Sequence, residues 1–180
     1  RPEGVVWRNP DTLEERARGF RAEGTRAWDR RLLPVVIRGS VAILVAAGLD
    51  HRFSWSVPPP PPSRGVALLL ATTGYVLTGW AMAENRFFSG TVRIQRDRGH
   101  GVVSSGPYRL VRHPGYAGSL LGTLCVPIVL GSWWALAPAG LVSLALVLRT
   151  ALEDDLLRTE LEGYEAFAGR TRYRLVPGVW

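Results

Sequence analysis

Four long apolar stretches alternate with arginine-rich segments along this 180-residue chain. They cover residues 32–49, 65–83, 116–130 and 133–148. Apolar runs of this length are typical of membrane-spanning helices, because a span takes about 20 residues of helix. A soluble domain mixes apolar and polar residues at shorter range. We therefore expect an all-α fold, a polytopic helical membrane bundle of about four transmembrane helices.

The connections between these stretches carry their own signals. Only Gly131-Ser132 separates the last two stretches, which predicts a tight helical hairpin, although each stretch is slightly short for a perpendicular crossing. The connector 50–64 contains five consecutive prolines, Pro58–Pro62, so we expect extended polyproline rather than helix there. Arg38 lies inside the first span, where it either snorkels to the membrane surface or has a partner within the bundle.

Amphipathic segments flank the predicted bundle on both sides. Residues 12–31 have helical character with sparse apolar positions, which suits either the membrane surface or a solvated helix. Residues 150–168 are acidic, and their apolar residues recur at helical spacing, which predicts a second amphipathic helix. Because the N-terminal region is charged throughout, we expect no signal peptide. We divide the chain into an N-terminal segment, 1–31, and a single membrane domain, 32–180.

The charge pattern predicts an orientation. The net charge is +7 and all 22 basic residues are arginines, which gather in the N-terminal segment, in residues 84–115 and in the tail 169–180. The connector between the first two spans holds only Arg52 and Arg64. The positive-inside rule then predicts that both termini and residues 84–115 are cytosolic. Because the charge flanks apolar runs, it favours lipid over nucleic acid, and we expect no nucleic-acid partner.

Several common kinds of site are excluded by the motifs that are missing. Cys125 is the single cysteine, so neither a disulfide nor a cysteine-rich metal site is possible. His100 and His113 have no carboxylate at ligand spacing, and no HExxH, CxxC or GxSxG motif is present, so we expect no metal and no serine hydrolase. Gly99-His100-Gly101 lacks the strand, turn and helix context of a dinucleotide-binding loop.

Two groups of residues remain as candidates for chemistry. Residues 106–116, GPYRLVRHPGY, combine prolines that fix the backbone with tyrosines, arginines and a histidine. The alternative is an interfacial loop whose tyrosines and arginines only anchor the chain at headgroup depth. Arg149 and Glu153 share one helix face where the last apolar run ends. They form either an ordinary helix pair or a binding site, and arginine before glutamate is the less favourable order for a helix pair.

At these residues the sequence resembles the isoprenylcysteine carboxyl methyltransferase family, within a wider group of membrane methyltransferases that includes phospholipid N-methyltransferases. The resemblance covers about residues 74–180 and is carried by VRIQRDRGHGVVSSGPYRLVRHPGYAG and RTALEDDLLRTELEGYEAFAGRTRYRLVPGVW. It implies S-adenosylmethionine as the cofactor and S-adenosylhomocysteine as the product. It also implies methyl transfer to a lipophilic substrate, for which we expect an isoprenylcysteine-like carboxylate.

The resemblance also implies the residues of the site. The cofactor pocket would lie within residues 92–180 and be lined by Gln95, His100, Gly101, Val102, Val103, Tyr108, His113, Pro114, Gly115, Tyr116 and Glu153. Arg149 would face the substrate as a catalytic residue, with Arg112 as a second catalytic arginine. The family usually has consecutive glutamates after this arginine, whereas here the run is Glu153-Asp154-Asp155, so the resemblance assigns a role to Glu153 alone.

Chemistry and partners follow from this assignment. A carboxylate acceptor is ionised at pH 7 and needs no base, whereas an amine acceptor would need His113 or Glu153 to take a proton. The expected partners are a lipophilic small-molecule or lipidated substrate and membrane lipid, with no obligate protein partner. Two other interpretations stay open: an NADPH-dependent membrane reductase resembling the steroid 5α-reductase group, and a non-catalytic membrane scaffold. Binding of S-adenosylmethionine or of NADPH distinguishes them.

Overall fold

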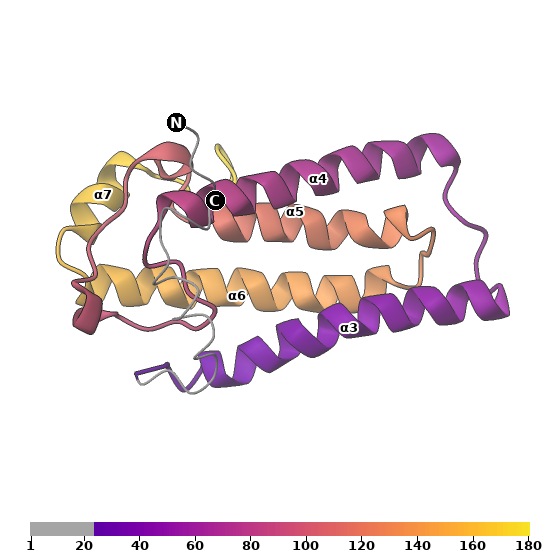
Figure 1. The fold of residues 1–180 in the computed structure, drawn as a ribbon, viewed down its shortest axis with the longest axis horizontal. Coiled ribbons are helices and arrows are strands. Elements are labelled where there is room, and N and C mark those ends of the chain that lie inside the picture. The colour runs from indigo at the N-terminus through magenta and orange to yellow at the C-terminus, as the bar shows by residue number, and fades with distance from the viewer. Residues whose placement is uncertain (1–23) are drawn as a thin grey trace.

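The computed structural model describes residues 24–180, which form a bundle of α-helices covered at one end by a long loop (Figure 1). The bundle consists of α3 (Asp29–Phe53), α4 (Pro61–Glu84), α5 (Pro114–Val129) and α6 (Leu136–Glu160). The described residues also include a short helix, α7 (Tyr164–Arg170), and two 3-10 turns, η2 (Arg96–Arg98) and η3 (Gly106–Arg109), and they contain no strand. The predicted all-α class is therefore confirmed.

Three of these helices, α3, α4 and α6, are long and apolar enough to cross a membrane. α5 is also apolar, but its 16 residues reach only about 24 Å, less than a typical hydrocarbon core. The outer faces of α3 and α4 expose aliphatic side chains such as Val41, Leu44 and Leu69, which are stable against lipid. The chain is therefore an integral membrane protein built as a helical bundle, as predicted.

The bundle is made of two close helix pairs, α4 with α5 and α3 with α6 (Figure 1). Glycines bring the first pair together: a Cβ added at Gly118 would lie 2.3 Å from the Gly74 carbonyl oxygen, and one added at Gly74 would lie 2.5 Å from that of Gly118. Small residues at contacts are the usual means of close helix packing in membranes. In the second pair, Ile43 and Ala47 of α3 share a buried apolar cluster with Val142 of α6.

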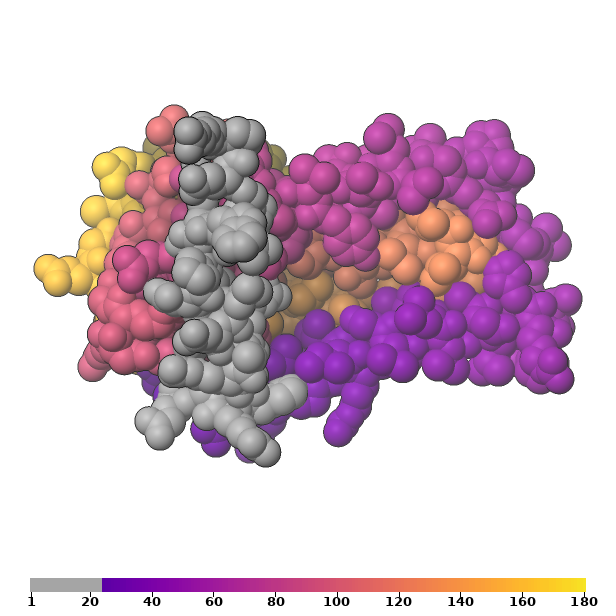
Figure 2. Space-filling view, viewed as in Figure 1, coloured from indigo at the N-terminus to yellow at the C-terminus, as the bar shows by residue number. Residues whose placement is uncertain are grey.

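α3 and α4 lie on opposite sides of the bundle and leave a gap between them. Figure 2 shows α5, coloured orange, exposed between α3 in indigo and α4 in magenta. Between these two long helices, the inner part of the bundle is therefore in direct contact with the surrounding medium. In a membrane that medium is the hydrocarbon of the bilayer.

The first two predicted spans, 32–49 and 65–83, lie inside α3 and α4, which extend beyond them at both ends. The prediction of a non-helical connector at 50–64 holds for residues 54–60. It is wrong at both ends, because 50–53 belong to α3 and 61–64, including Pro61–Pro62, belong to α4. The N-cap Pro60 has polyproline angles, φ −55° and ψ 146°. Proline is tolerated in the first helical turn because the N–H that it lacks has no intrahelical acceptor there.

The predicted hairpin is formed by α5 and α6, which are joined by a turn in which Gly131 has a φ of 77°. The predicted amphipathic stretch 150–168 is not a separate helix. α6 continues without a break to Glu160, because no proline or glycine interrupts it after the apolar run, and the chain turns at Gly163 (φ 79°) before α7. One rigid helix therefore carries the apolar span and the acidic residues that follow it.

Two predictions concern the N-terminal side of the chain. Of the predicted helix 12–31, residues 24–28 lie in turns and α3 begins at Asp29, while residues 12–23 lie outside the described residues. Arg38 is exposed on α3, and no ion pair joins it to the residues that the structure describes. A partner within the bundle is therefore not found, and the exposed position suits snorkelling to the membrane surface.

Residues 85–113, here named the cap loop, cover one end of the bundle together with α7 and the C-terminal tail (Figure 1). Backbone hydrogen bonds fasten the tail to the end of this loop. The N–H groups of Arg112 and His113 donate to the carbonyls of Tyr173 and Arg174, each at 2.9 Å. The cap loop is therefore held over the helix ends from both sides, by α4 and by the tail.

Candidate functional site

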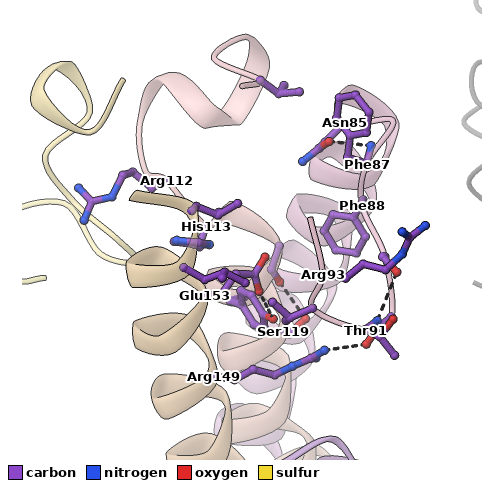
Figure 3. Close-up of a pocket in the computed structure, with 18 of the residues that line it drawn as sticks. Asn85, Phe87, Phe88, Thr91, Arg93, Arg112, His113, Ser119, Arg149 and Glu153 are labelled. Carbon is purple, nitrogen blue, oxygen red and sulfur yellow. Dashed lines mark hydrogen bonds between the residues drawn. The ribbon is translucent and has the colours of Figure 1, made fainter. Parts of the chain in front are cut away.

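A cavity of about 440 Å³ lies beneath the cap loop, at the end of the bundle. Its walls include residues of α3, α4, α5, α6, α7 and the cap loop. Figure 3 shows side chains from the cap loop, from the start of α5 and from α6 arranged around this space. Small-molecule sites in proteins typically have volumes of about 300–1,000 Å³, so the cavity has the size of a cofactor or substrate site.

The structure brings nearly all of the sequence-predicted site residues to this cavity. The predicted residues that line it are Gln95, His100, Gly101, Val102, Val103, Tyr108, Arg112, His113, Gly115, Tyr116, Arg149 and Glu153. Pro114 is the exception, because it is fully buried as the first residue of α5. The lining also extends outside the predicted range 92–180, to the stretch Asn85–Thr91 and to parts of α3 and α4.

Glu153 is the only acidic residue among the described residues that line the cavity. The hydroxyl of Tyr116 donates a hydrogen bond of 2.6 Å to Glu153 Oε2. In the described part of the chain no basic side chain forms an ion pair with this carboxylate. Its negative charge therefore remains available to a cationic ligand.

Arg149 lies one turn before Glu153 on α6, yet its guanidinium binds elsewhere. Its Nε donates to Asp29 Oδ1 at 2.6 Å, and its Nη2 donates to Asp29 Oδ2 at 3.2 Å and to the Gly90 carbonyl at 2.6 Å. The guanidinium carbon also lies 5.6 Å from the centre of the Tyr116 ring, in cation–π range. The ordinary helix pair considered from the sequence is therefore not formed, and Arg149 pairs instead with a residue 120 positions earlier.

Asp154, the residue after Glu153, is fully buried, does not line the cavity, and binds residues of the cap loop and of the tail. Arg112 donates to both of its oxygens, from Nε at 2.7 Å and from Nη2 at 3.0 Å. Arg174 of the tail donates to it as well, from Nε at 2.9 Å. Arg158, one turn later on α6, donates from Nε at 3.2 Å. A buried carboxylate is stable only when it is paired and hydrogen-bonded, and these three arginines supply that compensation.

His113 is oriented by the same buried carboxylate. Its Nε2 lies 3.1 Å from Asp154 Oδ1 and 3.3 Å from the hydroxyl of Tyr164, which itself donates to Asp154 at 2.9 Å. Burial, together with the adjacent charge of Asp154, raises the pKa of the Tyr164 hydroxyl well above its ordinary value, so this hydroxyl keeps its proton. The imidazole of His113 is thus fixed at the cavity wall.

A second wall is aromatic and uncharged. The rings of His100 and Phe87 lie 4.6 Å apart with an angle of 35° between them. The Gln95 N–H donates to His100 Nδ1 at 3.2 Å, which leaves the proton of the neutral ring on Nε2. Burial, followed by the charges of Arg93 and Arg98, lowers the pKa of His100 from 6.5 to about 4. His100 is therefore neutral at pH 7 and presents an N–H donor.

Two predicted residues, Gln95 and Tyr108, use their polar atoms to hold the cap loop. Gln95 Nε2 donates to the Phe87 carbonyl at 2.7 Å, and its Oε1 accepts from Arg98 Nη1 at 2.6 Å. The hydroxyl of Tyr108 accepts from Asn85 Nδ2 at 3.2 Å. Burial raises the pKa of this hydroxyl above its ordinary value, so it stays protonated. Both residues shape the cavity wall through contacts within the protein.

Comparison with known proteins decides the family of this site. The family model described as phospholipid methyltransferase matches residues 63–161, which is more than half of the chain. This chain belongs to the phospholipid methyltransferase family. The match runs from the first turn of α4 through the cap loop and α5 to the end of α6, so it includes most of the cavity.

Two curated relatives agree with this membership. Both are described as "Probable protein-S-isoprenylcysteine O-methyltransferase", one from Oryza sativa subsp. indica and one from Oryza sativa subsp. japonica. Each is 33% identical to this chain over 66 residues, which are 36% of the chain and 35% of the relative. The match thus spans about a third of the length of these relatives. The resemblance inferred from the sequence motifs is confirmed at the level of the family.

This member of the phospholipid methyltransferase family also uses residues that sequence reasoning missed. Asp29 precedes the family match, and nothing in its local sequence indicates that it would meet Arg149. Asp154 received no role from the resemblance, yet it joins α6, the cap loop and the tail. A signal for Asp154 exists, because Leu146 and Thr150 precede it at i−8 and i−4 and so share its buried face of α6.

Proposed function

We propose that this membrane protein is an S-adenosylmethionine-dependent methyltransferase that methylates a lipophilic acceptor, with an isoprenylcysteine-like carboxylate as the first candidate. The observation that carries the proposal is the Glu153 carboxylate, which lines a cofactor-sized cavity without a basic partner among the described residues. Membership of the phospholipid methyltransferase family supports methyl transfer over an NADPH-dependent reductase or a non-catalytic scaffold.

The residues around the cavity fit this cofactor. S-Adenosylmethionine is cationic at its sulfonium and ammonium groups, and an unpaired carboxylate such as Glu153 suits a cation. Its adenine ring is flat and heteroaromatic, which suits the wall of Phe87 and the neutral His100. We propose that Glu153 and this wall bind the cofactor together with Tyr116, His113 and the other predicted cofactor residues.

When bound, the cofactor supplies a methyl group on a sulfonium, which a nucleophilic atom of the acceptor displaces directly. The protein has to align the acceptor and exclude water. We propose that Arg149 binds an anionic group of the acceptor, because it lines the cavity beside Glu153. A carboxylate acceptor needs no base. For an amine acceptor, Glu153 is the carboxylate placed to take the proton, since Asp154 is fully buried and does not line the cavity.

The contacts of Arg112 favour a positioning role. Its Nε and Nη2 donate to Asp154, and its Nη1 donates to the carbonyls of Thr171 and Arg172 at 2.9 and 2.6 Å. All three nitrogens thus bind within the protein. We propose that Arg112 fixes the turn before His113, while its action as a second catalytic arginine stays a prediction.

We propose that the acceptor reaches the site from the bilayer, through the gap between α3 and α4. The cavity lining includes residues inside the two helices that flank this gap, Val36 and Ser40 of α3 and Tyr75 and Thr78 of α4. A lipid chain in this arm would replace bilayer hydrocarbon at little cost, while its polar head reached Arg149 and Glu153.

The arginine-rich end of the bundle is the cytosolic end in this proposal. The cap loop, the start of α3 and the C-terminal tail all lie at that end, as the positive-inside rule requires (Figure 1). Residues 32–180 would then act as one membrane domain, with the cofactor reached from the cytosol. Access of a labelling reagent to residues of the cap loop, in sealed vesicles of known orientation, tests this assignment.

The first experiment is calorimetry on detergent-purified protein with S-adenosylmethionine, S-adenosylhomocysteine and, as a comparison, NADPH. We expect both adenosyl ligands to bind with Kd on the order of micromolar, and binding to be lost in Glu153→Ala and His113→Ala. Asp155→Asn, a neighbouring carboxylate on the outer side of α6, should bind like the wild type. Well-folded protein that binds only NADPH would move the assignment to a reductase, and binding of neither would favour a scaffold.

The acceptor class is tested by methyl transfer from radiolabelled S-adenosylmethionine. N-Acetyl-S-farnesylcysteine offers a carboxylate, and phosphatidylethanolamine vesicles offer an amine. Label that is released as volatile methanol by base identifies a methyl ester, whereas label that withstands base identifies N-methylation. The carboxylate proposal predicts base-labile label on the farnesylcysteine and none on the phospholipid.

A further inference from the structure

Asp29 is the point at which three separate segments of the site meet. It is the first residue of α3 and is fully buried. Its Oδ1 accepts from Arg149 of α6 at 2.6 Å, and its Oδ2 accepts from the Val92 N–H of the cap loop at 2.8 Å and from Arg149 Nη2 at 3.2 Å. Apolar residues often replace a buried ion pair without loss of stability, so this pair calls for another explanation.

Arg149 has a competing partner within its own helix. Glu153 follows it by four residues, a spacing at which arginine and glutamate side chains form ion pairs on a helix surface. In Figure 3 the Arg149 side chain instead reaches across from α6 toward the segment of Thr91, with Glu153 above it and hydrogen-bonded by Tyr116. The two side chains thus form no ion pair with each other, although both line the cavity.

One nitrogen of Arg149 remains free for a ligand. Nε and Nη2 donate to Asp29 and Gly90, whereas Nη1 has no hydrogen-bond partner among the described residues. The Arg149 side chain is 8% exposed, and Nη1 is not among the fully buried side-chain atoms that lack a hydrogen-bond partner in the described residues. Because Arg149 lines the cavity, this nitrogen can donate two hydrogen bonds to a group bound there.

We propose that Asp29 is a positioning residue that holds Arg149 away from Glu153, so that the Glu153 carboxylate and one donor nitrogen of Arg149 stay available to ligands. Glu153 is then free for the cationic methyl donor, and Arg149 Nη1 is free for an anionic group of the acceptor. The identity of these two ligands rests on the proposed function, whereas the separation of Arg149 from Glu153 does not. Asp29 lies ahead of the family match, so the site is completed by a residue outside it.

The separation can be tested without any ligand. The coupling between Arg149→Gln and Glu153→Gln is measured from unfolding of detergent-purified protein, once in the wild-type background and once with Asp29→Asn. We expect no stabilising coupling in the wild type and a stabilising coupling in Asp29→Asn, because Arg149 then turns to Glu153. The same coupling in both backgrounds overturns the proposal.

Ligand binding gives a second, more specific test. Asp29→Asn should weaken S-adenosylmethionine binding about tenfold or more, because Arg149 then covers the carboxylate. Adding Arg149→Gln to Asp29→Asn removes the covering cation and should restore the affinity to within about threefold of the wild type. A folded double variant that binds as weakly as Asp29→Asn alone would falsify the proposal. Because removal of an unpaired buried charge can also restore folding, the Arg149–Glu153 coupling above distinguishes a covered carboxylate from a purely structural loss.

Two further variants serve as controls for this test. Asp50→Asn is the matched control, because Asp50 is also a buried aspartate of α3, at the opposite end, where Ser56 and Ser132 donate to it. It should leave S-adenosylmethionine binding unchanged. If Asp29→Asn does not fold, Asp29→Glu keeps the charge and should retain the affinity, and Asp29→Asn with Arg149→Gln should still fold. Wild-type protein that binds no S-adenosylmethionine would refute the proposed function, while the unfolding measurements would still decide the role of Asp29.

Discussion

The guanidinium of Arg112 and the carboxylate of Asp154 face each other through two hydrogen bonds, 2.7 Å from Nε and 3.0 Å from Nη2. Arg112 lies near the end of the cap loop and Asp154 lies on α6, and the side chains are 3% and 0% exposed. Since the same arginine also donates to two carbonyls of the tail, one buried pair joins the loop, the tail and the bundle beside Glu153.

Replacing Asp154 with asparagine should therefore destabilise the protein by about 3–5 kcal/mol, because Arg112 stays buried without its counter-charge. Unfolding of detergent-purified protein by heat or denaturant measures this loss. The control is Asp155→Asn, whose side chain is 67% exposed and which should change stability by no more than about 0.5 kcal/mol. Equal effects of the two substitutions would contradict a central role for the buried pair.

Glu153 and Tyr116 should differ in their effect on cofactor binding. Glu153→Gln removes the only acidic charge of the described cavity lining, so S-adenosylmethionine binding should weaken about tenfold or more. Tyr116→Phe removes the hydrogen bond to this carboxylate but keeps the charge, so the loss should be smaller. Calorimetry measures both, with Glu162→Gln as an exposed control. A greater loss of S-adenosylmethionine affinity for Tyr116→Phe than for Glu153→Gln would show that the cofactor is not bound through the charge of the carboxylate.

His100 predicts a particular dependence of stability on pH. Its pKa is about 4 in the folded protein, against 6.5 for the ordinary group, because burial and two arginines disfavour the imidazolium. The unfolded chain therefore binds the proton more readily, so the contribution of His100 to stability is full above pH 6.5 and is lost as the pH falls toward 4.

The pH prediction is checked by the difference between two unfolding curves. His100→Gln should lose less stability than the wild type between pH 6.5 and pH 4, since glutamine does not titrate. Parallel curves for the wild type and His100→Gln would mean that the folded and unfolded states bind this proton equally well.

The sequence was sufficient to predict the membrane bundle but not the ends of its helices. Apolar runs reveal a span because every residue in contact with lipid must be apolar, and this requirement is local. A run of prolines argues against a helix, yet Pro61–Pro62 begin α4. This is possible because the N–H groups of the first helical turn have no intrahelical acceptor, so the N–H that proline lacks is not needed there. The continuity of α6 past Arg149 was likewise hidden, since the residues turn polar there while the helix goes on.

The candidate site was likewise predictable from the sequence only in part. His113, Gly115 and Tyr116 are close in the chain, so a short motif was enough to predict that they lie together at one site, and all three line the cavity. The partner of Arg149 could not be predicted, because Asp29 lies 120 residues away and only the packing of α3 on α6 brings them together. Patterns along a sequence indicate burial and periodicity, but they do not indicate which distant residues meet.

The close contact between α4 and α5 predicts how a larger residue between these helices changes the stability of the protein. An alanine Cβ at Gly118 would lie 2.3 Å from the Gly74 carbonyl oxygen, so Gly118→Ala should force the helices apart and destabilise the protein by about 1–3 kcal/mol. Gly79→Ala is the matched control on α4, where an added Cβ meets nothing within 4 Å, and it should leave stability unchanged or slightly raised. Thermal unfolding in detergent compares the two. Similar unfolding midpoints for the two variants would show that the close contact between α4 and α5 does not limit the size of the residue at position 118.

Substitution of Arg149 should weaken binding of the acceptor much more than binding of the cofactor. Arg149→Ala removes the free Nη1 but leaves Glu153 and Tyr116 in place, so S-adenosylmethionine binding should be mostly kept. The KM for an anionic acceptor such as N-acetyl-S-farnesylcysteine should rise, or turnover should be lost. Arg149→Lys should recover only part of this, because a lysine ammonium cannot bind Asp29 with two nitrogens and still offer a third. Equal loss of cofactor binding and of turnover in Arg149→Ala would instead point to a structural role, in which the Asp29 pair holds α3 against α6 and the acceptor is bound elsewhere.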